Sequence, residues 1–154
     1  MTRDEFVLMI DLRLKMVRAE YDLTQEKIAR ILGISKKKII EVEKGRSSLG
    51  WSGAIACGSV FSDSKILQAD FGSDLADLIH AMAFQDENPT YPKVPSPQYG
   101  WKTIDTLHGL SVEHNTVSDY YRLTDADHVT LFASFDKAMV NERFEVEKVL
   151  RKLN

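Results

Sequence analysis

Cysteine and proline are both scarce in this chain, and each scarcity excludes something. Cys57 is the one cysteine, so no disulfide can form within the chain, and we expect a reducing, cytoplasmic location. All four prolines fall between residues 89 and 97, which leaves the remainder free of this helix-breaking residue. No apolar run approaches the roughly 18 to 20 residues of a membrane span, and the acidic start at Asp4 and Glu5 is unlike a secretory signal. We therefore expect no membrane partner.

Signatures of catalysis and of bound cofactors are missing as well. The chain contains no glycine-rich phosphate loop and no Gly-x-Ser-x-Gly motif. Its four histidines show no metal-ligand spacing, whereas a zinc site needs three or four converging ligands. We predict that the protein is not an enzyme, binds no metal and uses no cofactor.

Positive charge is concentrated at one end of the chain. Residues 1–50 contain eleven Lys and Arg against eight Asp and Glu, whereas residues 51–154 contain nine against fifteen. This asymmetry is expected when one part of a protein touches phosphate groups. On charge alone, a solvated charged surface is an equal alternative.

Two short helical patterns meet at a glycine between residues 24 and 45. Thr24 can cap the first pattern, Gly33 can end it sharply, and Ser35 can cap the second. The inward apolar positions are Ile28, Ala29 and Leu32 in the first pattern, and Ile39 and Val42 in the second. Two helices joined by such a turn form a helix-turn-helix, whose second helix can enter a DNA major groove.

The same stretch resembles the DNA-binding domain of the Cro/C1-type (XRE) phage and bacterial repressors. The resemblance covers roughly residues 8 to 70, and its matching pieces are Thr24-Gln25-Glu26, Ala29, Gly33, Ser35 and Glu43-Lys44-Gly45. That family often pairs an arginine, here Arg18, with the glutamate that is Glu43 here. The resemblance thus implies a bidentate ion pair that orients the first helix against the recognition helix.

Geometry assigns DNA contacts to the second helix of this motif. Lys36 and Lys37 occupy its first turn, where lysine side chains reach base edges and donate to guanine. Lysines in isolation indicate only a solvated polar face, and it is the surrounding motif that favours DNA. The full set of expected DNA-binding residues is Gln25, Ser35, Lys36, Lys37, Lys38, Ile40, Glu41, Lys44 and Arg46.

Five helices are expected in the first 70 residues. The first runs from about Glu5 to Tyr21, the fourth from Leu49 to Val60, and the fifth from Asp63 to Ala69 with Asp63 or Ser64 as its cap. Residues 71–86 predict an additional helix, which could pack on this domain or form a dimer contact. Residues 87–98 hold the prolines and predict a linker.

Residues 99–154 predict a small domain of four antiparallel strands and a C-terminal helix, which makes the whole chain α+β. The expected strands are 101–106, 110–114, 117–123 and 129–135. The last strand is expected to face the core with Val129, Leu131, Ala133 and Phe135, and the helix with Val140, Phe144, Val149 and Leu150. Tyr120, Tyr121 and Arg122 are the residues marked for ligand binding, although aromatic side chains in so small a sheet more often form the core.

These observations favour a sequence-specific DNA-binding transcriptional regulator, of the repressor kind, that binds double-stranded DNA as a homodimer. Residues 99–154 would then supply dimerisation or bind a small-molecule or protein effector. The alternative is an interaction protein of the antitoxin or anti-repressor kind, whose C-terminal half binds a protein partner.

Overall fold

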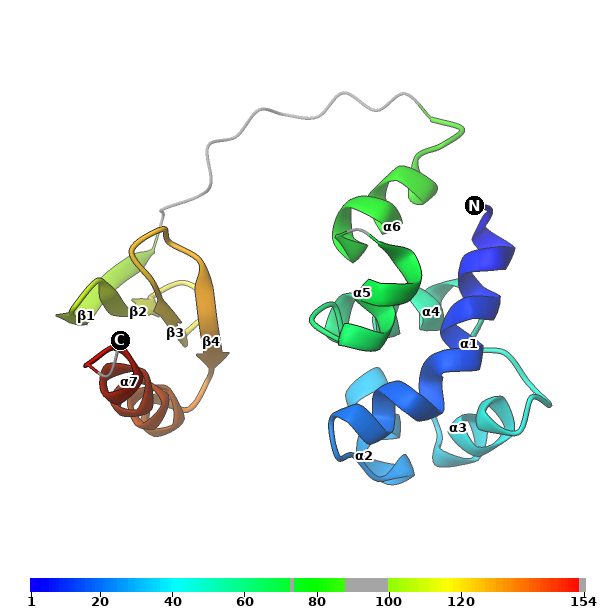
Figure 1. Ribbon diagram of the computed structural model, residues 1–154, viewed down its shortest axis with the longest axis horizontal. Coiled ribbons are helices and arrows are strands. Elements are labelled where there is room, and N and C mark those ends of the chain that lie inside the picture. Colours follow the sequence, from blue (N-terminus) through cyan, green and yellow to red (C-terminus); the bar gives the residue numbers. More distant parts are fainter. Residues whose placement is uncertain (73, 88–99, 153–154) are drawn as a thin grey trace. The chain divides into compact units, whose positions relative to one another are not determined.

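The computed structural model describes residues 1–72, 74–87 and 100–152, and the chain forms two units, Met1–Tyr91 and Pro92–Asn154 (Figure 1). We call them unit 1 and unit 2. Helices make up the described part of unit 1, and unit 2 contains an antiparallel sheet and the last helix. The expected α+β class is therefore confirmed. The predicted linker, 87–98, lies outside the described residues except for Glu87.

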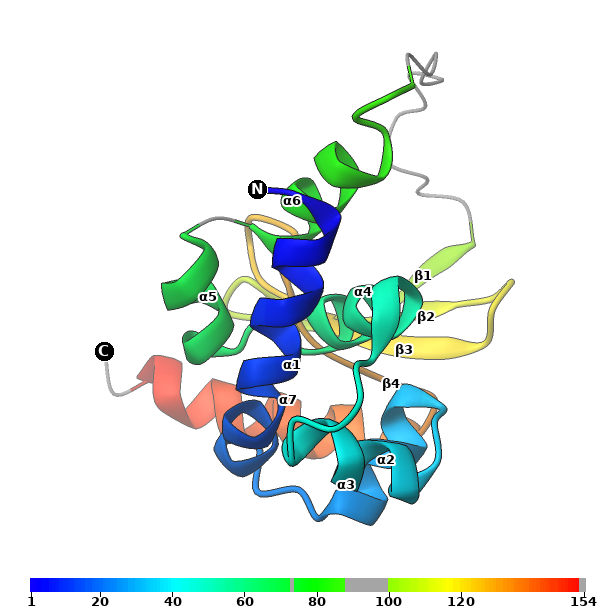
Figure 2. The ribbon, with the colours of Figure 1, turned by 90° about the vertical axis from the view of Figure 1, so that its right-hand side faces the viewer.

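The helices of unit 1 pack around α1. Their bounds are α1 Arg3–Glu20, α2 Gln25–Leu32, α3 Lys36–Glu43, α4 Gly50–Val60, α5 Lys65–Phe71 and α6 Leu75–Ala83. Helix α1 buries Phe6, Ile10, Leu14 and Val17, which recur at helical spacing and lie at the centre of the unit's apolar core. Helices α2 and α3 lie together at the end of the unit where α1 finishes (Figure 2).

Side-chain caps set where these helices begin. Thr2 and Glu5 form a capping box, so α1 starts two residues earlier than expected. Thr24 and Ser35 accept hydrogen bonds from backbone amides in the first turns of α2 and α3. Ser64, rather than Asp63, caps α5.

The helix predicted over 71–86 belongs to unit 1. Leu75 and Met82 of α6 are buried in the same core as α1. Gly58 of α4 makes this packing close, because an added Cβ there would lie 3.2 Å from Ile79 and 3.3 Å from Phe6. The α4 glycine that weakens the helix in isolation thus allows another helix to approach.

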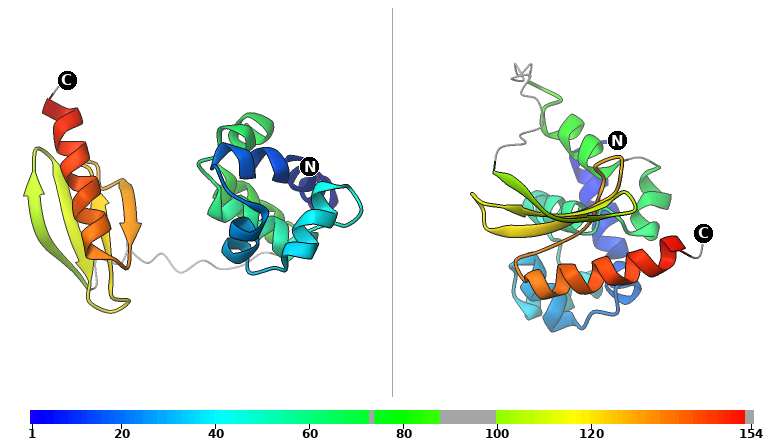
Figure 3. Two further views of the ribbon diagram at one scale, coloured as in Figure 1. Left: turned by 90° about the horizontal axis from the view of Figure 1, so that it is seen from below. Right: turned by 90° about the vertical axis from the view of Figure 1, so that its left-hand side faces the viewer.

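Unit 2 is a four-stranded meander covered by one helix. The strands are β1 Trp101–Leu107, β2 Leu110–Asn115, β3 Tyr120–Thr124 and β4 Thr130–Ser134, in the order β1-β2-β3-β4. Helix α7, Lys137–Lys152, lies across one face of this sheet (Figure 3). The core between them contains Leu110, Val112, Leu123, Val140 and Phe144.

Two strand predictions in unit 2 were wrong in detail. Strand β3 begins at Tyr120 rather than at residue 117, because the Asn115 side chain accepts hydrogen bonds from the amides of Val117 and Ser118 and holds a turn there. In the last strand, Leu131 packs against the core as expected and Phe132 also does, opposite Leu123. Val129, Ala133 and Phe135 are exposed instead, Phe135 at 76%. The pairing of β3 with β4 has a register shift beside Thr124. Because of this shift, successive side chains of β4 do not simply alternate between the two faces of the sheet.

The prediction for the last helix was half right. Val140 and Phe144 are buried against the sheet, but Val149 and Leu150 are exposed. Continuing the buried stripe by three and four residues from Phe144 reaches Glu147 and Lys148, not these two apolar residues. The second apolar pair therefore lies on another side of the helix.

Candidate nucleic-acid interface

A three-residue turn joins α2 to α3. Gly33 ends α2 in the left-handed conformation, with φ of 67°, and the amide of Ile34 donates to the carbonyl of Ala29 across the turn. Ser35 then caps α3 through the amide of Lys38, at 3.1 Å. Ile28, Ala29, Ile39 and Val42 bury the inner sides of both helices, so the polar side of α3 faces outward.

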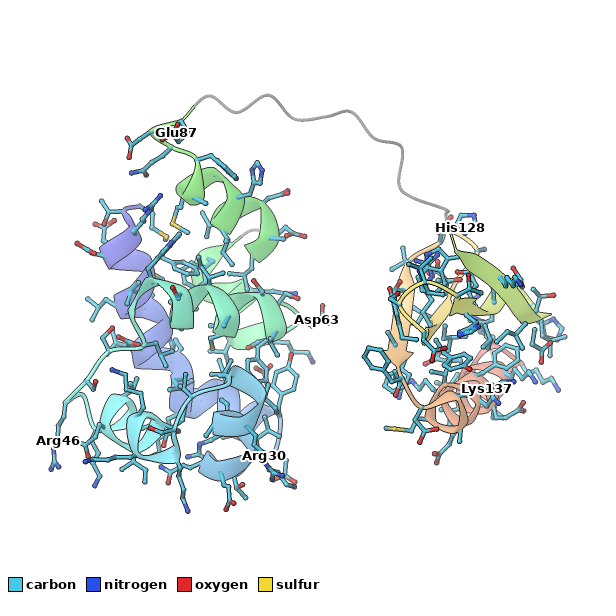
Figure 4. The ribbon with its side chains drawn as sticks, turned by 180° about the vertical axis from the view of Figure 1, so that it is seen from behind. Arg30, Arg46, Asp63, Glu87, His128 and Lys137 are labelled. Carbon is cyan, nitrogen blue, oxygen red and sulfur yellow. The ribbon has the colours of Figure 1, made fainter. Side chains whose placement is uncertain are left out.

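Four cations are exposed along or just after α3. Lys36 and Lys37 lie in its first turn, Lys44 caps its end, and Arg46 follows it. Arg46 projects from unit 1 at the end opposite Glu87, the same end at which Arg30 of α2 lies (Figure 4). This end of the unit therefore presents several flexible cations to solvent, as a phosphate-binding surface requires.

Lys38 and Glu41 are less free than their positions on the helix predicted. The Lys38 ammonium donates to the Ser47 hydroxyl at 2.7 Å, which ties α3 to the segment that follows it. Glu41 is half-buried, and one of its carboxylate oxygens lies 4.0 Å from an Arg46 guanidinium nitrogen. Both residues were expected to contact DNA, and in this structure Lys38 contacts Ser47 and Glu41 lies near Arg46.

Arg18, Glu43 and Gln25 form one network behind α3. Arg18 donates two hydrogen bonds to the Glu43 carboxylate, at 2.6 and 3.0 Å, and a third to the carbonyl of Leu23. The Gln25 amide donates to the same carboxylate at 2.8 Å. The pair expected from the family resemblance thus has a third member. Gln25 was expected to hold a phosphate, but its side-chain NH2 group already donates one hydrogen bond to Glu43.

The environment of Glu43 favours its charged form. Burial by itself would raise the pKa of this carboxyl, since only 5% of its side chain is exposed. Hydrogen bonds from Arg18 and Gln25, together with the charges of Arg18 and Lys15, outweigh that effect and lower the pKa below its usual value. Three elements of unit 1 are consequently held in place by one ionised side chain.

Two surface hollows beside α3 are lined by most of the expected DNA-binding residues. One, of about 550 Å³, is lined by Lys15, Arg18, Thr24, Gln25, Ile40, Glu43 and Lys44. The other, of about 330 Å³, is lined by Ser35, Lys37, Lys38, Glu41, Arg46 and Ser47. The structure thus brings eight of the nine expected DNA-binding residues to these two hollows, and the ninth, Lys36, lies beside Ser35 and Lys37 at the start of α3.

Lys15 and Ser47 line the two hollows, and they were not among the residues expected from the sequence. Lys15 is exposed on α1 and lines the first hollow, and Ser47 receives the Lys38 hydrogen bond in the second. Lys15 precedes Arg18 by three residues, so helical spacing puts both on one side of α1. That spacing was the available signal. The Ser47 contact depends on the path of the chain after α3, and no sequence pattern predicts it.

The three residues marked for a ligand in unit 2 do not form one site. Tyr120 and Arg122 belong to the sheet face that α7 leaves open, where Arg122 lies 3.8 Å from the centre of the Trp101 ring and donates to Glu113 at 2.7 Å. Tyr121 alternates to the opposite face and stacks on His114, with ring centres 4.5 Å apart. Strand alternation separates these neighbours.

Neither a metal cluster nor a membrane-spanning helix is seen in the described parts of the chain. Within residues 1–72, 74–87 and 100–152, no three His, Cys, Asp or Glu side chains are grouped as metal ligands. No helix in those ranges is long and apolar enough to cross a membrane. Comparison of the chain with protein-family models, curated proteins and solved structures found no match.

Proposed function

We propose that this protein is a sequence-specific DNA-binding transcriptional regulator, of the repressor kind, that inserts residues 35–44 into the DNA major groove. The observation that carries the proposal is the position of Lys36 and Lys37. Both are exposed in the first turn of a capped helix whose other side is buried in the core. A helix held in this way presents its first turn to base edges in helix-turn-helix proteins.

Cations around α3 support this orientation. Lys15 and Lys44 line one hollow beside α3, and Arg46 lines the other together with Lys37. These cations would meet phosphates on both sides of the groove. The network of Arg18, Glu43 and Gln25 holds α1 and α2 against α3, so that the reading helix keeps one angle to the DNA. The local fit to the Cro/C1-type pattern in the sequence points to the same function.

The roles within the interface follow from these contacts. Lys36 and Lys37 donate to guanine O6 or N7, and Ile40 can contact a thymine methyl group. Lys38 acts indirectly in this proposal, because its ammonium holds Ser47 and so positions the segment that carries Arg46. Lys44, Arg46 and Lys15 bind phosphate without reading sequence.

Homodimer formation completes the proposal. One recognition helix contacts few base pairs, whereas two helices related by a two-fold axis read half-sites about 34 to 36 Å apart. Unit 2 would supply the pairing and leave the cations around α3 in unit 1 for the DNA.

Selection of bound duplexes from a random DNA pool tests the proposed function. We expect the full chain to enrich one sequence pattern, with an affinity that falls steeply as salt rises. Lys36→Ala and Lys37→Ala should each weaken binding to that sequence by about 1 to 3 kcal/mol, whereas Lys65→Ala, an exposed lysine of α5, should not. Failure to enrich any sequence would overturn the proposal and favour the protein-partner alternative.

A further inference from the structure

Helix α7 has two apolar sides, of which the sheet covers one. Val140 and Phe144 are buried against the strands. The second side contains Met139, Val146, Val149 and Leu150, whose exposed fractions are 51, 46, 57 and 49%. We call these four residues the outer stripe. No described element of unit 2 covers it.

The outer stripe follows a helical repeat. Its members are separated by seven, three and one residues from Met139 onward, so they lie along one side of a helix of 3.6 residues per turn. Glu142 also lies on this side, between Met139 and Val146 in sequence. Large apolar side chains along one side of a charged helix are typical of a helix that packs against a second helix.

Charges beside the outer stripe have a symmetry that points to the partner. Arg143 borders the stripe and forms an ion pair with Glu147 one turn later, at 3.3 Å. Arg143 and Glu147 are each two residues from Glu145 in sequence. Glu145 lies near the midpoint of the span from Met139 to Leu150. When two copies of the helix meet antiparallel at this midpoint, each Arg143 faces a Glu147, whereas parallel pairing brings like charges together.

We propose that α7 is a dimer interface, in which the outer stripe packs antiparallel against the outer stripe of a second copy of this chain. Met139 then lies opposite the partner's Leu150, and Arg143 lies beside the partner's Glu147. The pairing of Arg143 with Glu147 is self-complementary in charge, as a two-fold interface requires. This inference deepens the dimer element of the proposed function, and its tests use no DNA, so failure of either can be recognised separately.

Sedimentation of the full chain tests the apolar contact. A single helix pair is a small interface, so the concentration series should extend to about 200 µM. We expect a monomer–dimer equilibrium, and Val146→Glu should raise its dissociation constant by roughly tenfold or more by burying an unpaired charge. Val117→Glu is the matched control in a turn of unit 2 and should leave the equilibrium unchanged. A chain that stays monomeric throughout, or a Val146→Glu variant that still dimerises normally, overturns the proposal.

A mixing experiment tests the charge pairing. Arg143→Glu and Glu147→Arg each break the ion pair within the helix and each create repulsion across the proposed interface. Neither variant alone should dimerise well, whereas an equimolar mixture should recover the dimer. Because the pair within each helix stays broken in the mixture, recovery can come only from contacts between chains. A mixture that remains as monomeric as its components contradicts the assignment.

Disulfide capture tests the antiparallel direction. Met139 and Leu150 are separated by about 16 Å along a helix, so only opposed directions bring one beside the other. Met139→Cys mixed with Leu150→Cys should form a crosslinked dimer on oxidation, and Met139→Cys alone should not. The native Cys57 is buried and does not compete. Efficient crosslinking of Met139→Cys to itself would contradict the antiparallel arrangement.

Discussion

Individual side chains in the α3 region divide into exposed cations and residues that are hydrogen-bonded to other side chains. Lys36, Lys37 and Arg46 are exposed, whereas Lys38 and Glu43 are bound to other side chains of unit 1. The three consecutive lysines of α3 therefore have different environments in the fold. Substitutions of these lysines should have effects of different kinds.

Arg46 should act through phosphate. We expect Arg46→Ala to weaken binding to all DNA sequences about equally and to reduce the salt slope by about one, because one counterion-releasing contact is lost. Titrations of a specific and an unrelated duplex over a salt series measure both effects. Lys65→Ala is the control for loss of an exposed cation. A change confined to the specific duplex would assign Arg46 to base reading instead.

Glu43 should link the stability of unit 1 to pH. Its pKa is lowered in the folded protein, so its contribution is present above the ordinary glutamate pKa and is lost as pH falls through the lower folded value. We expect Glu43→Gln to cost about 3 kcal/mol at pH 7, because it leaves Arg18 unpaired, and to flatten the loss of stability below about pH 4. Urea unfolding at several pH values is the measurement.

Glu26→Gln provides the comparison for this experiment. Glu26 is an exposed glutamate in the first turn of α2, and its replacement should change stability by a few tenths of a kcal/mol. Equal effects of the two substitutions would mean that the network of Arg18, Glu43 and Gln25 does not hold the helices together.

At the scale of elements, Gly33 contributes to the turn between α2 and α3 through its backbone conformation. Gly33 has φ of 67°, and an added Cβ would meet no atom within 4 Å. Replacement therefore introduces no clash, and its cost is the cost of a left-handed residue.

Gly33→Ala should consequently destabilise unit 1 by about 1 kcal/mol, and Gly33→Asn by less, since asparagine tolerates the left-handed region. Chemical denaturation of the three proteins measures the order. Asparagine as costly as alanine, or an alanine variant as stable as the wild type, would show that the turn is not held in this conformation.

Local chemistry explains which elements could be predicted. The caps at Thr24 and Ser35 and the turn at Gly33 act within a few residues, so sequence alone located α2 and α3. Which side of β4 faces the core depends on a register shift, and which side of α7 is buried depends on where the sheet lies. Both are properties of tertiary packing. The third member of the ion network, Gln25, likewise depends on how α2 meets α3.

At the scale of the whole molecule, the two units have separate cores. The apolar cluster of unit 1 and that of unit 2 share no residue. Each is built from elements that are contiguous in the chain, with short loops between them. Such an arrangement is typical of domains that fold independently.

A fragment of residues 1–87 should therefore fold by itself. We expect its helical circular dichroism and its urea midpoint to match those of the same unit in the full chain, because every buried partner of α1 is retained. Residues 100–152 serve as the reciprocal fragment. An unfolded 1–87 fragment, or a midpoint that falls when unit 2 is removed, would mean that the two units stabilise each other.

Reading of DNA by the first turn of α3 is the central claim, and a base-by-base measurement of binding energy tests it most directly. Affinities of the wild type and of Lys36→Ala and Lys37→Ala would be measured against every single-base variant of the selected site. We expect each substitution to remove discrimination at one base pair per half-site, by about 1 to 3 kcal/mol, and to leave the other positions unchanged. Energy profiles identical to that of the wild type would contradict the assignment of α3 as the reading helix.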